Sequence, residues 1–319
     1  MRELRRPRVL VALGGNAIAS PAGGVDAESQ EKAVASAAEQ IADLVKEDYD
    51  VMLTHGNGPQ VGNLLLKNHI ARDVVPAVPL DWCVAQTQAT IAYMLVTALE
   101  AALGRRGVGR LVVPLITRVL VDPADAAWEQ PSKPIGGYIV EEEARSRIAA
   151  GEYWKQEGER GWRRCVPSPA PREILDLAAI LQLIRDGAVV IAGGGGGIPM
   201  VRGPDGTLRG VEAVLDKDRT GALLAHATGA DQFVIATDVE AAALAYGTSQ
   251  QEWLRHVEPD RLRALLSENH FATGSMGPKV EAALSFVEQG GRRAVITSLQ
   301  NVLAAVEGEA GTVVERGAP

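Results

Sequence analysis

Three lysine residues stand in sequence contexts that suit the binding of a phosphate group. Lys279 follows Pro278, which we expect to be the first residue of a helix, because proline is favoured there. A helix dipole disfavours a cation in this turn by about 0.3–1 kcal/mol, whereas a bound phosphate would attract both the helix N-terminus and the ammonium. The alternative interpretation of Lys279 is a solvated surface lysine.

The other two lysines have acidic or rigid neighbours. Asp216-Lys217-Asp218 precedes a second predicted helix, and the two carboxylates at alternate positions could both orient the ammonium of Lys217. The alternative is a helix-capping aspartate beside an unrelated lysine. Lys133 lies in the sequence Pro-Ser-Lys-Pro, where the prolines stiffen the chain and would let the side chain reach over a site.

Glycine-rich stretches supply a second signal for a phosphorylated ligand. There are four: Gly14-Gly15-Asn16, His55–Gln60, Gly193–Gly197 and Gly274–Gly277. We expect them to follow apolar strands and to meet at one end of a parallel sheet, where helix N-termini present free N–H groups to anions. A single stretch could be an ordinary tight turn, but four predict a phosphate-binding site.

Two common nucleotide signatures are missing from the sequence. It contains no G-x-x-x-x-G-K-[ST], which argues against a P-loop enzyme. The stretch that begins at Gly56 has Val61 where a dinucleotide-binding loop needs its third glycine.

Short apolar runs alternate with amphipathic ones along the chain. We expect strands at Val9–Leu13, Val51–Thr54, Leu111–Ile116, Val189–Ala192, Phe233–Thr237 and Ala294–Thr297. We expect helices at Ser29–Glu47, Asp81–Leu103, Glu173–Asp186, Asp218–Ala227, Pro259–Glu268 and Pro278–Gln289. Continuous apolar strands between helices are typical of a mainly parallel sheet covered on both faces, so the predicted fold class is an α/β three-layer sandwich.

One segment, at about 120–171, departs from this alternation. It holds five aromatic residues, several prolines and a charged helix expected at Glu141–Gly151. An insertion of about 50 residues in a compact domain is usually functional, so we predict a small protruding arm that carries Lys133. The alternative is a peripheral decoration.

Composition excludes several classes of protein. The net charge of −8 among 319 residues argues against a nucleic-acid or anionic-membrane binder, and 46% hydrophobic content argues against a disordered chain. The apolar run Val9–Leu13 is too short for a secretory signal, and no run of about 20 apolar residues suggests a membrane span. Two cysteines cannot form a disulfide framework, so we expect a cytoplasmic protein.

Taken together, these motifs resemble the carbamate kinase family of the amino acid kinase superfamily. The resemblance rests on residues 11–17, HGNGPQVG (His55–Gly62), Gln86–Leu95, Ser132–Gly136, Gly161–Pro169, GGGGIP (Gly194–Pro199), EAVLDKD (Glu212–Asp218), Thr237–Val239 and GSMGPKVEAA (Gly274–Ala283). They follow the family's order over nearly the whole chain.

The resemblance implies a single domain, 1–319, with the amino acid kinase fold and a homodimeric assembly. Carbamate would bind in the N-terminal half, about 1–187 with the arm, and nucleotide in the C-terminal half, about 188–319. The implied catalytic residues are Lys133, Lys217, Asp218 and Lys279, with Asp218 organising the lysines. The implied substrate pocket is Gly14, Gly15, Asn16, Gly56, Asn57 and Gly58, and the implied nucleotide site is Gly194, Gly195, Thr237, Asp238, Tyr246, Met276 and Gly277.

The implied reaction is ATP + carbamate = ADP + carbamoyl phosphate, with Mg²⁺ bound to the nucleotide and no protein residue assigned as its ligand. In metabolism it often runs toward ATP. Some positions depart from the family pattern: Ala241–Gly247 lacks larger side chains, Thr273 replaces a usual proline, and Gly137-Tyr138 replaces a frequent Pro-Phe. Two alternatives stay open: a related kinase that forms another acyl phosphate, and a catalytically silent nucleotide sensor.

Overall fold

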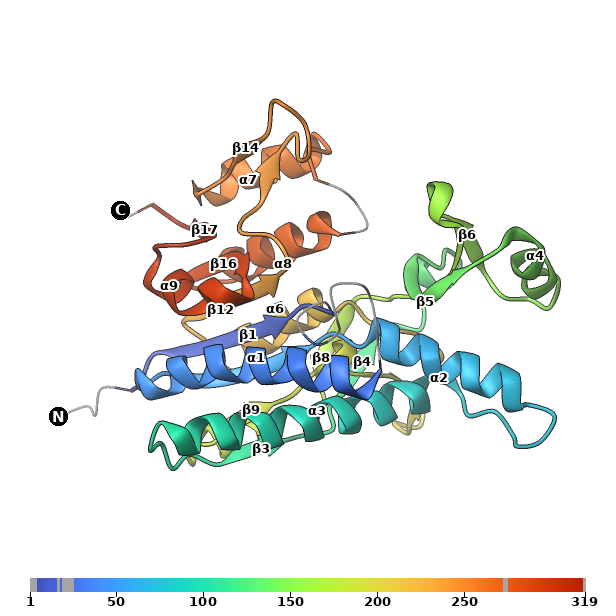
Figure 1. The fold of residues 1–319 in the computed structure, drawn as a ribbon, viewed down its shortest axis with the longest axis horizontal. Coiled ribbons are helices and arrows are strands. Elements are labelled where there is room, and N and C mark those ends of the chain that lie inside the picture. Colours follow the sequence, from blue (N-terminus) through green and yellow to red (C-terminus); the bar gives the residue numbers. More distant parts are fainter. Residues whose placement is uncertain (1–4, 16–17, 19–25, 272–274, 318–319) are drawn as a thin grey trace.

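A parallel sheet runs through the middle of the molecule (Figure 1), in a computed structural model that describes residues 5–15, 18, 26–271 and 275–317. Its strand order is β15 (His256–Val257), β17 (Thr312–Glu315), β16 (Arg293–Ser298), β12 (Gln232–Thr237), β1 (Arg8–Leu13), β2 (Asp50–His55), β9 (Val189–Ile191) and β3 (Val112–Pro114). Neighbouring strands are parallel except β16 and β17. All six predicted strands are confirmed within this sheet.

Side chains of the sheet enter two separate helical layers. On β1, Val9, Val11 and Leu13 pack with α1 (Ala27–Lys46), α3 (Leu80–Arg105) and α9 (Val302–Glu307). Leu10 and Ala12 face the opposite layer, formed by α5 (Leu177–Arg185), α6 (Lys217–Ala227), α7 (Pro259–Ser267) and α8 (Met276–Glu288). Because strand side chains alternate, a continuous apolar strand buries both faces. The predicted three-layer sandwich is confirmed. Within the described ranges, no helix combines the length and the apolar character that a membrane crossing requires.

Several predicted element boundaries were wrong. Residues after His55 form helix α2 (Gly58–Ala71), where only a glycine loop was expected, because Pro59 occupies its first turn. Pro171–Ile174 is strand β8 rather than the start of a helix, and α5 begins only at Leu177. Helix α8 begins at Met276, so Pro278 is its third residue. The stretch that ends at Gly277 therefore follows α7 and not a strand.

The predicted arm is present but shorter than expected (Figure 1). Its sheet has the order β5 (Lys133–Ile139), β7 (Trp162–Val166) and β6 (Trp154–Gln156), and it includes helix α4 (Glu141–Ala149). The outer parts of 120–171 belong to a different sheet, in which β4 (Arg118–Val121) and β8 pair with each other and continue into β10 (Ile198–Arg202) and β11 (Leu208–Gly210). The remaining ribbon, β13 (Ala243–Leu244) with β14 (Glu252–Trp253), lies near α7.

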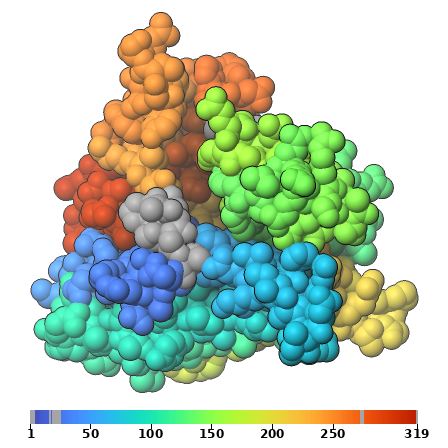
Figure 2. Space-filling model, turned by 45° about the vertical axis from the view of Figure 1, so that its right-hand side comes forward, coloured from blue at the N-terminus to red at the C-terminus, as the bar shows by residue number. Residues whose placement is uncertain are grey.

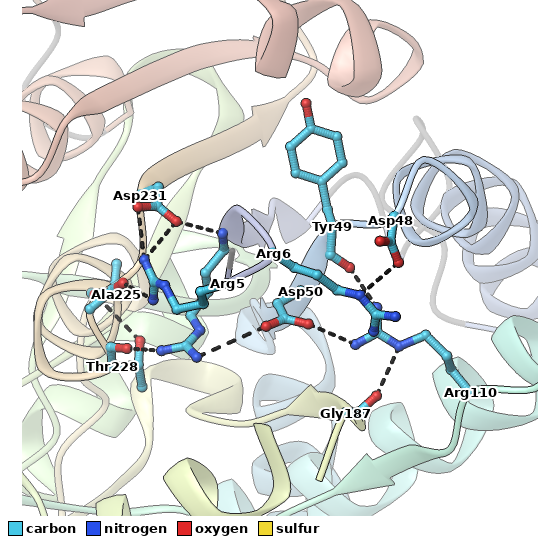
Figure 3. Close-up of polar contacts among 12 residues, drawn as sticks. Arg5, Arg6, Asp48, Tyr49, Asp50, Arg110, Gly187, Ala225, Thr228 and Asp231 are labelled. Atoms are coloured by element: carbon cyan, nitrogen blue, oxygen red, sulfur yellow. Dashed lines mark hydrogen bonds and ion pairs between the residues drawn. The ribbon is translucent and has the colours of Figure 1, made fainter. Parts of the chain in front are cut away.

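At the end of the sheet where β1 and β2 begin, ion pairs and backbone contacts join distant segments (Figure 3). The guanidinium of Arg8 donates to the carbonyl of Thr228, directly after α6, and lies 4.0 Å from the Asp50 carboxylate. Arg110 pairs with the other Asp50 oxygen at 3.0 Å. Asp231 accepts the Arg8 backbone N–H at 2.6 Å. This network ties α6, whose other end carries Lys217, to the first two strands.

Candidate active site

The first turn of α6 presents the acidic and basic residues of the Asp-Lys-Asp motif. The Asp216 side chain caps the helix, accepting the backbone N–H groups of Asp218 at 2.9 Å and Arg219 at 3.2 Å. Asp216, Lys217 and Asp218 are only 8%, 8% and 3% exposed. Charged side chains are rarely buried so completely unless they are paired, so their partners define the site.

Asp218 joins two of the three predicted lysines. Its Oδ1 lies 2.5 Å from Nζ of Lys217, and its Oδ2 lies 3.2 Å from Nζ of Lys279. Lys279 comes from the first turn of α8, which packs beside α6. Asp218 therefore contacts both lysines, and the organising role that the resemblance implied for it stays a prediction.

Asp216 holds the third lysine, and this corrects one expectation. Nζ of Lys133, at the start of the arm strand β5, lies 2.6 Å from Asp216 Oδ2. The two carboxylates thus have different lysine partners and do not share the ammonium of Lys217. Asp216 is both the helix cap and an ion-pair partner, a role that local spacing could not reveal because Lys133 is 83 residues away.

The electrostatics of the cluster favour an added anion. Burial lowers the pKa of Lys217, and nearby Lys279 lowers it further, while Asp218 opposes both effects. Burial alone would raise the pKa of Asp216, but the ammonium groups of Lys133 and Lys217 and the hydrogen bonds to the carboxylate together hold that pKa below its ordinary value. Three ammonium groups against two carboxylates leave a surplus positive charge, which a phosphoryl group would compensate.

Two of the glycine turns lie directly against this cluster. Gly14 follows β1 and donates its N–H to Ala236 at 2.9 Å, and Gly56 follows β2 and donates to Leu13 at 3.0 Å. A Cβ atom on Gly56 would lie 3.3 Å from the Gly15 nitrogen and 3.4 Å from Cδ of Lys217. Gly58 begins α2, beside Asn57 at the helix cap position. Among the predicted pocket residues, Gly56 therefore lies against Lys217 and Gly15 lies against Gly56, while Asn16 lies outside the described residues.

The third glycine stretch packs against the end of β2. A Cβ on Gly194 would lie 2.3 Å from His55 Nε2, and one on Gly195 would lie 2.1 Å from Asn57 Nδ2. The Asn57 amide in turn donates to Thr87 at 2.9 Å. Gly195 thus lies against Asn57, a predicted substrate-pocket residue, and Gly194 lies against His55. The assignment of both glycines to the nucleotide stays a prediction.

Four polar residues that sequence reasoning missed hold this glycine stretch in place. Oγ1 of Thr54 donates to the Gly193 carbonyl at 2.9 Å, and Nε2 of Gln88 donates to the Gly194 carbonyl at 2.9 Å. Oγ1 of Thr117 accepts the Gly193 N–H at 2.9 Å, and Oγ1 of Thr220 donates to the Gly196 carbonyl at 2.8 Å. All four residues are buried. Buried polar groups require partners, but these four residues lie in four separate segments of the chain, so no local pattern marks them.

The predicted nucleotide residues occupy the C-terminal part of the molecule. Thr237 ends β12, the strand beside β1, and donates to Asp238 at 3.0 Å. Met276 and Gly277 begin α8, three and two residues before Lys279. Tyr246 is 64% exposed, with its ring 6.3 Å from that of Trp253. Figure 2 shows a recess in the surface, with the arm (green) on one side and the C-terminal part (orange and red) on the other.

The acidic residues of the site are paired, and the two cysteines are buried. No group of three or more His, Cys, Asp or Glu residues suited to a metal ion occurs in the part of the chain that the structure describes. Asp216 and Asp218 are already engaged with ammonium groups. Both cysteines are buried and unbridged, and burial raises the pKa of each thiol.

Comparison with known proteins agrees with this geometry. The amino acid kinase family model matches residues 7–298. A carbamate kinase of Pyrococcus furiosus is 45% identical, covering 96% of this chain and 98% of its own length. Carbamate kinase 1 of Enterococcus faecium is 43% identical, covering 97% and 99%. The structure of carbamate kinase from Giardia lamblia bound to AMP-PNP is 38% identical with a TM-score of 0.91, covering 98% of this chain and 99% of that one. The chain belongs to the amino acid kinase family and, within it, to the carbamate kinases.

Proposed function

We propose that this phosphotransferase catalyses ATP + carbamate = ADP + carbamoyl phosphate at the cluster of Lys133, Lys217, Lys279, Asp216 and Asp218. The observation that carries the proposal is the convergence of three ammonium groups from β5, α6 and α8 on two buried carboxylates. The glycine turn after β2 lies against Lys217, and the turn after β1 lies against that glycine turn. Backbone N–H groups and cations at one point are suited to a transferring phosphoryl group.

The chemistry needs little from the protein beyond alignment and charge. Carbamate is already an anionic nucleophile, so no general base is required. As the phosphoryl group moves, charge spreads over its three equatorial oxygens. In the proposed mechanism Lys217 and Lys279 bind these oxygens from the sheet side, while Lys133 approaches from the arm. Asp218 keeps the first two ammonium groups together, and Asp216 positions the third.

The nucleotide would bring Mg²⁺ with it. The carboxylates of the site are occupied by lysines, so nucleotide oxygens and water would supply most of the metal's ligands. The metal would add further charge neutralisation at the phosphates. The proposal also includes a cytoplasmic location, arginine metabolism and net formation of ATP, all of which rest on the family resemblance.

We further propose a homodimer with α3 at its interface. Trp82 and Tyr93 are 60% and 70% exposed on α3, and eleven residues are about three helical turns, so they share one face. Next to this helix, β3 is an edge strand of the sheet among the described residues, and edge strands can pair with another chain. A second copy of the chain could cover both features.

The reaction is tested by ATP formation from ADP and carbamoyl phosphate with purified protein. We expect ATP to form with magnesium and not without it. In the forward direction, carbamate should be phosphorylated while N-acetylglutamate and acetate should not. ATP formation from an acyl phosphate other than carbamoyl phosphate would favour the related-kinase alternative. Binding of ATP in calorimetry with no turnover in either direction would favour the silent sensor.

A further inference from the structure

The arm touches the rest of the molecule at an unusually close backbone contact. Gly62 lies on α2, and Gly136 lies on the arm strand β5, three residues after Lys133. A Cβ atom on Gly62 would lie 1.9 Å from Cα of Gly136 and 2.4 Å from its nitrogen. Both atoms belong to the backbone, so no side chain could rotate away to make room.

The strand is shaped for this contact. The pairing of β5 with β7 shifts between Ile135 and Tyr138, which leaves Gly136 in a bulge. Gly136 has φ of +70°, a left-handed conformation that favours glycine. The carbonyl of Gly136 accepts a hydrogen bond from Nε of Arg163 at 3.0 Å, which fixes the bulge to β7. Bulges bend a strand locally, and here the bend brings β5 onto α2.

Apolar side chains also pack the base of the arm against α2. Ile135 on β5 and Val166 on β7 are 1% and 4% exposed, and they share a cluster with Val61 on α2. Val214, two residues before Asp216, belongs to the same cluster. The glycine contact, the apolar cluster and the Lys133–Asp216 ion pair therefore form one continuous connection between α2, the arm and α6.

We propose that Gly62 and Gly136 are positioning residues for the reaction: their contact sets how far the arm sits from α2 and thereby where the Lys133 ammonium lies. The inference rests on the proposed role of Lys133. A methyl group at Gly62 would have to move Gly136 by about 1.5 Å to reach ordinary van der Waals separation. A displacement of about 1 Å at a reacting group can cost about 10²-fold in rate, so the contact matters for turnover.

The experiment compares Gly62→Ala with wild type and then repeats the change in a Lys133→Ala background. The Lys133→Ala variant by itself tests the proposed role of Lys133. We expect Gly62→Ala to lower kcat about 10–100-fold, with the KM for ADP changed less than threefold. In the Lys133→Ala background the same change should lower kcat less than twofold, because the displaced group is already absent. Non-additivity of this kind is what coupling through Lys133 requires.

One matched control lies on the same arm strand, and another lies in a helix. A Cβ on Gly137, the next residue of β5, or on Gly104 of α3 meets nothing within 4 Å, so Gly137→Ala and Gly104→Ala should keep wild-type kcat. Modification of Lys133 by acetic anhydride, measured by peptide mass spectrometry relative to Lys155 of the arm, should rise in Gly62→Ala. This readout is independent of activity.

Unchanged kcat in Gly62→Ala, or an equal loss in both backgrounds, would overturn the proposal. If Gly62→Ala does not fold, Arg163→Met is tested in its place. This variant removes the hydrogen bond from Nε of Arg163 to the Gly136 carbonyl, which fixes the bulge of β5 to β7. For that variant we again expect a loss of kcat that disappears in the Lys133→Ala background. An equal loss in both backgrounds, or no loss, would be decisive against the inference.

Discussion

At the residue scale, the site is a small set of charges with different partners. Asp218 pairs with both Lys217 and Lys279, whereas Asp216 pairs with Lys133. Each buried carboxylate therefore controls separate ammonium groups. Substitution of one lysine should weaken charge stabilisation in the reaction. The aspartate that pairs with it would still contact another lysine or the backbone N–H groups of α6.

Replacing Lys279 with alanine should slow turnover without unfolding the protein. Loss of one positioned donor to a developing anion typically costs about 2.7–4 kcal/mol, so we expect kcat to fall about 10²–10³-fold. Asp218 retains Lys217 as a partner at 2.5 Å, which protects the fold. Initial rates of ATP formation measure the effect, and Lys155→Ala on the arm is the control. A fall of less than tenfold would remove Lys279 from the mechanism.

Stability should decrease as the pH falls from about 6.5 toward 4, because of His55. Burial lowers the pKa of this fully buried imidazole from 6.5 to about 4, against a smaller opposite effect of its contact with the Gly56 carbonyl. The unfolded chain binds a proton in that range and the folded one does not, so acid favours unfolding. The shift corresponds to about 3 kcal/mol.

Chemical denaturation between pH 4 and 7.5 measures this contribution. The slope of the free energy of unfolding against pH should become shallower in His55→Gln than in wild type. His270→Gln, at an exposed histidine paired with Glu268, should leave the slope unchanged. An identical pH profile for His55→Gln and wild type would disprove the assignment.

At the element scale, two ends of α6 have separate tasks. Its first turn carries Lys217 and Asp218, while the residue after its last turn, Thr228, accepts from Arg8 (Figure 3). Arg8 is itself held by Asp50, which also binds Arg110. The network fixes the helix from the end of the sheet opposite to the one that bears the glycine turns.

Asp50→Asn should be much more destabilising than Asp48→Asn. The Asp50 carboxylate is 13% exposed and faces two guanidinium groups that are 11% exposed, and breaking such a pair costs about 3–5 kcal/mol. Asp48 is 70% exposed and pairs with Arg6, so its loss should cost less than about 1 kcal/mol. Asparagine tolerates the φ of +64° at position 48, so Asp48→Asn should remove the ion pair without adding backbone strain. Urea denaturation measures both, and equal losses would refute this role of Asp50.

At the scale of the whole molecule, the exposed apolar face of α3 should mediate self-association. Tyr93→Glu would place a charge in the proposed interface, so we expect its dimer to dissociate at a protein concentration at least tenfold higher than wild type. Tyr153→Glu, at a 44% exposed tyrosine on the arm, should leave association unchanged. Light scattering over a dilution series reports the mass. A monomeric wild type, or an unaffected Tyr93→Glu dimer, would contradict the proposed interface.

Much of the architecture could be predicted from short stretches of the sequence. Continuous apolar runs such as Phe233–Thr237 identified strands buried on both faces, because both of their faces meet helices. The short strands β4, β8, β10 and β17 could not be recognised in the same way. Their apolar content is mixed, and their pairing depends on partners far away in the chain.

The three lysines and the glycine turns could be singled out from residue type and spacing, because phosphate binding demands cations and close backbone approach. The organising role of Asp218 was implied by the family resemblance alone. The sequence by itself therefore determined the class of chemistry and the order of the main layers. The tertiary structure decided which carboxylate meets which lysine, and it placed Gly62 against Gly136. Those contacts join residues 61 to 83 positions apart or cross between a helix and the arm, so only the packing of distant elements could establish them.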